Sequence, residues 1–143
     1  IGPVPGLCQT GRMNGAMTMA TGCILVVDDD PSLGRALQRM VRSLDIDCEV
    51  SSSGDDMLAR VQGLRPTFVL LDIHMPEKSG IEALTEMRAL GLDVPTVMMT
   101  GVEREGTRET CLEAGAIEVL AKPVAAKTIS QLYERLGGPQ REG

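Results

Sequence analysis

The sequence predicts an α/β fold: a doubly wound, five-stranded parallel sheet with helices on both faces. Short, continuous apolar runs, typical of strands buried on both faces, alternate along the chain with longer segments whose apolar residues recur at helical spacing. Such alternation indicates parallel strands joined by right-handed crossovers. Polar residues follow the apolar runs, which places them at the edge of the sheet where α/β proteins bind ligands.

Composition excludes several other classes of protein. The core is expected to be aliphatic, with methionine filling gaps, because Phe68 and Tyr133 are the only aromatic residues. The net charge of −6 argues against nucleic acid or an anionic membrane as the main partner. No apolar run approaches the ~18 residues that span a bilayer. The four cysteines are scattered, so we expect free thiols in a reducing cytoplasm rather than disulfides or a zinc site.

One domain is predicted between two tails. Glycine and proline break every periodicity in residues 1–21, which we interpret as a disordered leader or an artificial tail. Residues 22–137 are predicted to form the domain. Residues 138–143 are interpreted as a C-terminal tail or a truncated linker.

The first two strands are predicted to flank a well-marked helix. Residues 24–27 form an apolar run that leads into three aspartates, and Pro31 suits the first turn of a helix with Asp30 as its N-cap. Residues 48–50 form a short, polar run, which predicts an edge strand. The apolar residues of the helix recur at helical spacing: Leu33, Leu37, Met40, Val41 and Leu44.

The second helix leads to the central strand. The helix is predicted to open at Ser53 or Gly54 and to end at Gly63 and Pro66. Residues 68–72 are four apolar residues followed by an aspartate, as expected of a strand that is buried on both faces and ends at a ligand site.

The third helix is predicted to open at Ser79 or Gly80 and to close at Gly91. A strand over residues 94–99 follows it and ends at Thr100. The inward residues of this helix are expected to be Leu84, Met87 and Leu90.

The last part of the chain repeats this pattern. The charged stretch 103–113 is interpreted as a solvated helix face, and the fourth helix should end at Gly115. Residues 117–120 predict the fifth strand, which ends near Lys122. The last helix carries Ile129, Leu132 and Leu136 at helical spacing.

Polar side chains at four strand ends form the candidate site. With the strand order 2-1-3-4-5, the first and third strands are neighbours, so Asp29 and Asp72 should meet, flanked by Thr100 and Lys122. Together with Asp28, three carboxylates would share one lysine, which leaves negative charge uncompensated. Oxygen ligands without nearby cysteine or histidine side chains favour Mg²⁺ or Mn²⁺ over zinc. Mg²⁺ commonly binds phosphate oxygens as well, and a carboxylate can act as a nucleophile toward phosphorus.

The region from about Cys23 to Leu136 resembles the receiver domain of two-component response regulators, the CheY-like fold. The combination and spacing of its motifs are highly specific for this family. These motifs are Val26-Val27-Asp28-Asp29, Leu71-Asp72-Ile73-His74-Met75-Pro76 with Gly80 after it, Met99-Thr100-Gly101, and Ala121-Lys122-Pro123.

The resemblance implies a signalling phosphoacceptor and not an enzyme that turns over a substrate. Asp72 would take a phosphoryl group from the phosphohistidine of a sensor histidine kinase or phosphotransfer protein. Asp29, Asp72 and the backbone carbonyl of His74 would ligate Mg²⁺, with Asp28 helping through water. The expected protein is bacterial and cytoplasmic.

The resemblance also assigns the remaining parts of the site and the surfaces. Thr100 and Lys122 would bind the phosphoryl oxygens, and the bond before Pro123 is a candidate cis peptide. An unknown output partner would bind the face formed by helix 4, strand 5 and helix 5, and activation could make a homodimer. No direct contact with nucleic acid or membrane is expected of this domain.

Three positions depart from the family or tune it. Val119 stands where many receivers have a tyrosine or phenylalanine that follows the threonine's position, so an aromatic readout is not expected. His74 and Val102, two residues beyond Asp72 and Thr100, occupy positions that tune dephosphorylation in the family.

A phosphatase of the haloacid dehalogenase type is the main alternative. It would use a strand-end D-x-D, formed here by Asp28 and Asp30, but it needs a further acidic pair after the lysine. The acids there, Glu134 and Glu142, are misplaced, and Asp72 would be unexplained. A flavodoxin-like FMN-binding protein shares the fold, but the chain lacks a hydroxyl-rich phosphate loop and aromatic residues to stack on a flavin.

Overall fold

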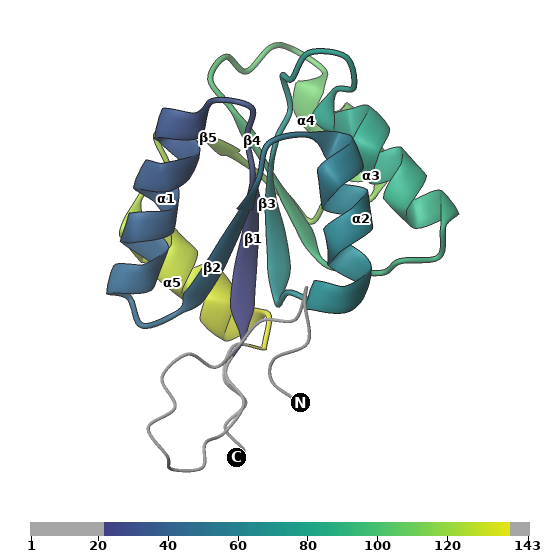
Figure 1. Cartoon of the computed structure of the whole chain (residues 1–143). Coiled ribbons are helices and arrows are strands. Elements are labelled where there is room, and N and C mark those ends of the chain that lie inside the picture. The colour runs from purple at the N-terminus through teal and green to yellow at the C-terminus, as the bar shows by residue number, and fades with distance from the viewer. Residues whose placement is uncertain (1–21, 138–143) are drawn as a thin grey trace.

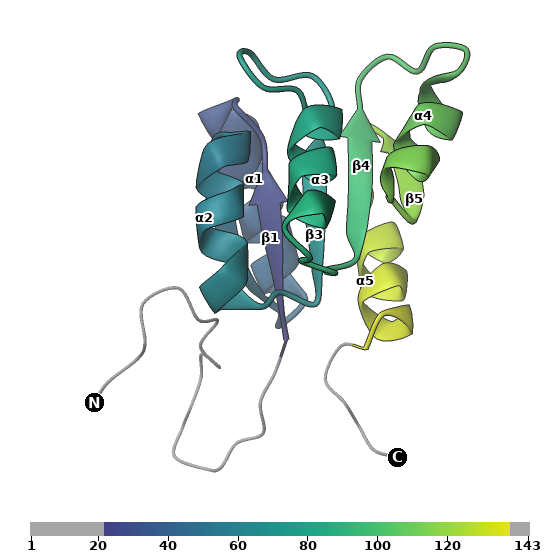
Figure 2. The same cartoon turned by 90° about the vertical axis from the view of Figure 1, so that its right-hand side faces the viewer.

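The computed structural model describes residues 22–137 and confirms the predicted architecture. Five parallel strands form one sheet in the order β2-β1-β3-β4-β5 (Figure 1). Figure 2 views this sheet from the face that α2, α3 and α4 cover, while α1 and α5 cover the opposite face. The two predicted tails, residues 1–21 and 138–143, lie outside the described residues.

Strands and helices alternate along the whole described chain. The strands are β1 (Cys23–Val27), β2 (Asp47–Ser51), β3 (Phe68–Asp72), β4 (Thr96–Thr100) and β5 (Glu118–Ala121). The helices are α1 (Pro31–Ser43), α2 (Gly54–Leu64), α3 (Gly80–Ala89), α4 (Thr107–Ala114) and α5 (Ala126–Arg135).

Two hydrophobic cores lie on opposite faces of the sheet, because successive residues of a strand point to opposite sides. In β3, Phe68 and Leu70 join the core beneath α1 and α5, whereas Val69 and Leu71 join the core beneath α2, α3 and α4. Methionine fills both cores, as the shortage of aromatic residues predicts. The fully buried methionines are Met57, Met87, Met98 and Met99.

Side-chain caps explain where α1, α2 and α3 begin, with Ser53 as the cap of α2. At α1, the Asp30 carboxylate accepts the backbone N–H groups of Ser32 and Leu33, as predicted for an N-cap. At α3, Ser79 and Glu82 form a capping box. The Ser79 Oγ accepts the Glu82 N–H at 3.1 Å, and the Glu82 Oε1 accepts the Ser79 N–H at 2.9 Å.

Some element ends differ from the prediction. The prediction that Leu90 points inward is wrong: α3 ends at Ala89, and Leu90 is 61% exposed beyond the last helical turn. Helix α2 continues through Gly63, because Arg65 adopts the left-handed C-cap conformation with φ of 51°. Helix α4 begins only at Thr107, so much of the charged stretch before it is loop.

The sequence predicts free thiols, but not all of the described cysteines are free. Cys48 and Cys111 are buried free thiols, and burial raises the pKa of Cys48 to about 12. The prediction is wrong for Cys23, which is disulfide-bonded, since scattered spacing along the chain does not show which sulfur atoms come together. Cys8 lies outside the described residues.

Helix α1 reaches over the edge strand β2. The Ser51 carbonyl accepts the Asp28 N–H at 3.1 Å, so Ser51 faces β1. Alternation along the strand therefore directs the Cys48 carbonyl toward the open edge. There it accepts hydrogen bonds from Gln38 Nε2 at 2.9 Å and from the Arg42 guanidinium at 3.0 Å.

The last helix is tied to the start of the first strand. The hydroxyl of Tyr133, in α5, accepts the backbone N–H of Gly22 at 2.9 Å. Tyr133 is 5% exposed, so it is a buried structural residue and not an aromatic group on the surface of α5. Within residues 22–137, no helix is both long enough and apolar enough to cross a bilayer.

Candidate functional site

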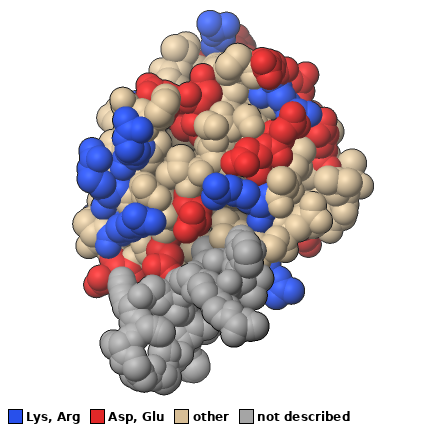
Figure 3. Space-filling view, viewed as in Figure 1, with Lys and Arg blue, Asp and Glu red and all other residues tan. Residues whose placement is uncertain are grey.

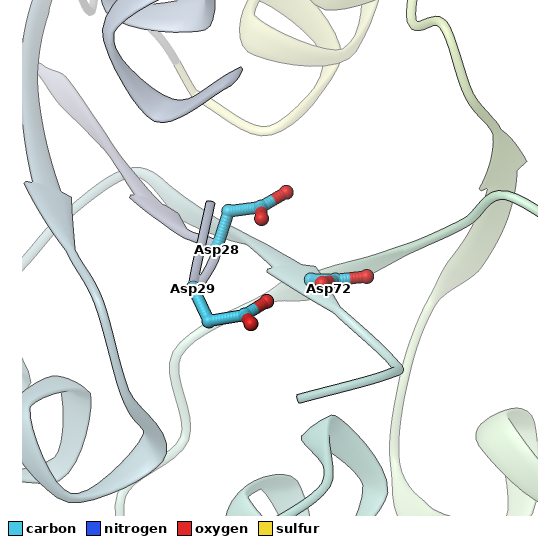
Figure 4. A group of neighbouring side chains, drawn as sticks. All are labelled: Asp28, Asp29 and Asp72. Atoms are coloured by element: carbon cyan, nitrogen blue, oxygen red, sulfur yellow. The ribbon is translucent and has the colours of Figure 1, made fainter. Parts of the chain in front are cut away.

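Three carboxylates meet beyond the ends of two adjacent strands. Asp28 and Asp29 follow β1, and Asp72 is the last residue of β3, which pairs with β1. The three side chains point into one region (Figure 4), and one oxygen of each lies within 4.8 Å of the others. Asp28 and Asp72 are 1% and 3% exposed, whereas Asp29 is exposed. The strand order explains this meeting, because it makes β1 and β3 neighbours.

Lys122 contacts both buried carboxylates. Its Nζ lies 3.1 Å from Asp28 Oδ2 and 3.2 Å from Asp72 Oδ1. Lys122 follows β5, and its backbone N–H bonds the Thr100 carbonyl of β4 at 2.9 Å. The Lys122–Pro123 peptide bond is cis. Two strands thus position one ammonium group between two carboxylates.

The site holds more negative than positive charge. Burial and the charge of Asp28 raise the pKa of Asp72, although Lys122 and the His74 N–H act in the opposite direction. Burial tends to lower the pKa of Lys122, but Asp28 and Asp72 outweigh it and the pKa is raised. Three carboxylates around one ammonium group favour a further cation beside Asp72.

The loops around the site hold the carboxylates by backbone N–H groups. The Asp28 Oδ1 accepts the Asp30 N–H at 2.9 Å, and the Asp72 Oδ1 accepts the His74 N–H at 3.3 Å. A Cβ on Gly80 would collide with the backbone carbonyl of Asp72, so the start of α3 passes against the end of β3. Glycine at this position therefore preserves the position of Asp72.

The Thr100 hydroxyl bonds the loop that follows its own strand. Thr100 ends β4, next to β3, and is 1% exposed. Its Oγ1 donates to the Val102 carbonyl at 2.8 Å and accepts the Val102 N–H at 3.2 Å. The hydroxyl thus closes a tight turn in the β4–α4 loop, a use that the sequence did not indicate.

The three tuning positions lie in different environments. His74 is exposed and adjoins Asp72 through its backbone. Val102 is 56% exposed, and Val119 is buried in β5. The Val119 carbonyl accepts a hydrogen bond from the Arg108 guanidinium at 3.3 Å. Sequence reasoning missed Arg108 because it stands in a charged stretch that was interpreted as a solvated helix face.

A small apolar cavity lies beside the lysine, between α1 and the loop after β5. Its volume is about 170 Å³. It is lined by Leu33, Ala36, Leu37, Met40, Met99, Lys122, Pro123 and Val124.

Comparisons with known proteins agree with the geometry. The family described as "Response regulator receiver domain" matches residues 24–134. Among curated relatives, the transcriptional regulatory protein ZraR of Salmonella typhimurium is 35% identical over 119 residues, which are 83% of this chain and 27% of that protein. The response regulator MprA of Mycobacterium sp. (strain KMS) is 33% identical over 106 residues, which are 74% of this chain and 46% of that protein. The chain thus spans less than half the length of these two relatives.

The comparison of folds gives the same result. The solved structure of the chemotaxis protein CheY4 of Vibrio cholerae superposes with a TM-score of 0.75 at 24% identity. The match covers 82% of this chain and 99% of that one. At this identity the likeness supports the fold alone.

Proposed function

Because this chain belongs to the response regulator receiver domain family, we propose that its Asp72 carboxylate accepts a phosphoryl group and that the resulting conformational shift regulates a partner or output domain. The observation that carries the proposal is the position of Asp72. It ends a central strand, lies among carboxylates within 4.8 Å, and touches the ammonium group of Lys122.

The chain's own residues divide the work of phosphoryl transfer. One oxygen of Asp72 attacks the phosphorus atom and forms a P–O bond, while the P–N bond to the donor histidine breaks and the imidazole keeps the electron pair. Lys122 neutralises charge on the phosphoryl oxygens, and Thr100 donates a hydrogen bond to one of them. The buried position of Asp72 keeps it fixed during the attack.

The donor set suits a hard divalent cation, Mg²⁺ or alternatively Mn²⁺. Asp29, Asp72 and the backbone carbonyl of His74 would hold it, with Asp28 assisting through water. The excess of carboxylates supports this assignment, since three of them surround the single ammonium group of Lys122. When bound, such an ion neutralises the charge that develops on the phosphoryl group.

The phosphodonor is proposed to be a sensor histidine kinase or a phosphotransfer protein in the bacterial cytoplasm. Basic side chains gather over α1 (Figure 3), whose arginines are Arg35, Arg39 and Arg42 and which has no acidic residue. In a chain of net charge −6, this helix favours an acidic surface on the donor. The output partner would bind the α4–β5–α5 face, and phosphorylation could also make a homodimer there.

The phosphatase alternative is not supported. The comparisons identify a receiver domain, and Asp30, the second acid of the supposed D-x-D, is used as the N-cap of α1. Self-catalysed phosphorylation and dephosphorylation are then the only chemistry we propose for this domain.

Intact mass spectrometry tests the proposal directly. The native protein and Asp72→Asn are incubated with acetyl phosphate, with and without Mg²⁺. We expect one acid-labile phosphoryl group on the native protein only, and only with Mg²⁺. Labelling of Asp72→Asn to the same extent, or no labelling of the native protein, would contradict the assignment of Asp72.

A further inference from the structure

The Thr100 hydroxyl cannot serve the phosphoryl group and the β4–α4 loop at once. A threonine hydroxyl has one proton, and here it goes to the Val102 carbonyl at 2.8 Å. Donation to a phosphoryl oxygen on Asp72 would therefore remove the bond that closes the turn. This step, and the inference below, rest on the proposed function.

Arg108 joins this loop to the edge strand β5. Its Nε lies 3.6 Å from the Glu103 carboxylate, and its terminal nitrogen donates to the Val119 carbonyl at 3.3 Å. Glu103 directly follows Val102, the residue that Thr100 holds. A continuous chain of contacts thus runs from the Thr100 hydroxyl to the backbone of β5.

Apart from its C-cap Gly115, whose carbonyl accepts a hydrogen bond from Arg88 at 3.0 Å, helix α4 has few other attachments. It spans only Thr107–Ala114, and Cys111 is its one buried residue. Its N-cap, Gly106, supplies no side-chain hydrogen bond, and residues 101–106 are exposed throughout. A short helix with one buried side chain and an uncapped start opens at low cost, so the contacts of Arg108 weigh heavily in its position.

We propose that Arg108 is the residue that transmits the state of Thr100 to the α4–β5 surface. Without a phosphoryl group, Arg108 holds the start of α4 against the Val119 carbonyl. When Thr100 releases Val102, Glu103 moves with the loop and draws the guanidinium away from β5. This readout uses the backbone of residue 119, so it works although valine has no ring to reorient.

Arg108→Ala and Glu103→Gln should have opposite effects on the hydrogen exchange of α4. Arg108→Ala removes the hold on β5, so α4 should exchange its amide hydrogens about fivefold faster before any phosphoryl group is present. Glu103→Gln keeps the bond to Val119 but removes the ion pair that pulls on it. In that variant α4 should stay protected even in the activated state. A merely structural role would loosen α4 in both variants.

Hydrogen exchange measured by mass spectrometry over residues 101–121 provides the test. Each protein is compared with and without beryllium fluoride, an unreactive phosphoryl mimic, in the presence of Mg²⁺. In the native protein the mimic should speed the exchange of α4, in Arg108→Ala the exchange should already be fast, and Arg108→Lys should restore part of the native protection. Arg104→Ala is the matched control, since no hydrogen bond or ion pair of that side chain is present within residues 22–137.

The outcomes separate this inference from the function on which it rests. If the native protein takes a phosphoryl group from acetyl phosphate but Arg108→Ala responds to the mimic as the native protein does, the role of Arg108 is overturned alone. Equal loosening of α4 in Glu103→Gln and Arg108→Ala overturns it as well. If the native protein takes no phosphoryl group, the proposed function and the role of Arg108 fail together.

Discussion

At the scale of single residues, the charge on Asp72 should destabilise the metal-free protein, and it should favour the folded state once the proposed cation binds. The pKa of Asp72 is raised in the folded protein, mainly by burial and then by Asp28. The folded protein therefore binds this proton more tightly than the unfolded chain does. The stability contributed by the group is full below the unfolded pKa and is lost as pH rises through the folded pKa.

Asp72→Asn should consequently stabilise the metal-free protein at pH 7. We expect a gain in the free energy of unfolding of about 1 kcal/mol, an ordinary size for a single substitution, which shrinks toward about pH 3. Added Mg²⁺ should stabilise the native protein more than the variant. Urea denaturation in EDTA and in Mg²⁺ across this pH range measures both effects, with Asp93→Asn, an exposed site, as control. If Asp72→Asn were less stable than the native protein in EDTA, the predicted destabilising effect of the Asp72 charge would be contradicted.

His74 is expected to influence the lifetime of the phosphorylated protein. Its exposed imidazole follows Asp72 by two residues, and its backbone N–H bonds the Asp72 carboxylate at 3.3 Å. Replacement by alanine should change the decay rate of the phosphoryl group by about tenfold or less, which is below the roughly 10²-fold or more of a fully positioned general acid or base. The decay is followed by intact mass at several pH values near neutrality, and identical rates at all of them would remove His74 from the mechanism.

The residues of the site could be predicted because their chemistry and their place at strand ends coincide. Asp28, Asp29, Asp72 and Lys122 come together as the parallel topology requires. The turn bonds of Thr100 and the reach of Arg108 could not be predicted. They depend on rotamers and on the path of an exposed loop, which leave no periodic signal in the sequence.

At the scale of elements, the start of α3 depends on its capping box. Ser79 and Glu82 each accept a backbone N–H that would otherwise lack a partner at the helix start. Ser79→Ala should lower the free energy of unfolding by about 1 kcal/mol, and Ser79→Asp, which keeps an acceptor, should lower it much less. Thermal or urea unfolding measures both. Equal losses in the two variants would show that the cap is not the source of the effect.

Element types were predictable, and element ends were less so. Continuous apolar runs identified the buried strands, and helical spacing identified the helices between them. The errors fall at termini, such as Leu90 at the end of α3 and the late start of α4. At such positions a few backbone hydrogen bonds decide the outcome, and apolar periodicity does not report them.

At the scale of the whole molecule, Tyr133 joins the two ends of the described chain. Its hydroxyl accepts the Gly22 N–H, 111 residues away in sequence. Burial raises the pKa of this phenol. The stability that the neutral phenol contributes is therefore full below the unfolded pKa of about 10 and is lost as pH rises through the folded pKa.

Tyr133→Phe should test both the hydrogen bond to Gly22 and the raised pKa of the phenol. At pH 7 it should lower the free energy of unfolding by about 1 kcal/mol, because the partly buried Gly22 N–H loses its acceptor. Above about pH 10 the difference in stability between the native protein and the variant should narrow, because the native phenol ionises and phenylalanine does not. Urea denaturation at the two pH values checks this. A stability difference that widens at high pH would contradict a raised pKa of Tyr133.

The contacts of α1 with the edge strand β2 have a consequence for aggregation at high protein concentration. An exposed edge strand is a template on which another chain can add a strand, which leads to aggregation and fibrils. Here the Cys48 carbonyl, which faces that edge, is already occupied by Gln38 and Arg42. A passing strand would have to displace a charged donor before it could pair. Two side chains of a single helix thus help to keep concentrated protein from growing into sheets.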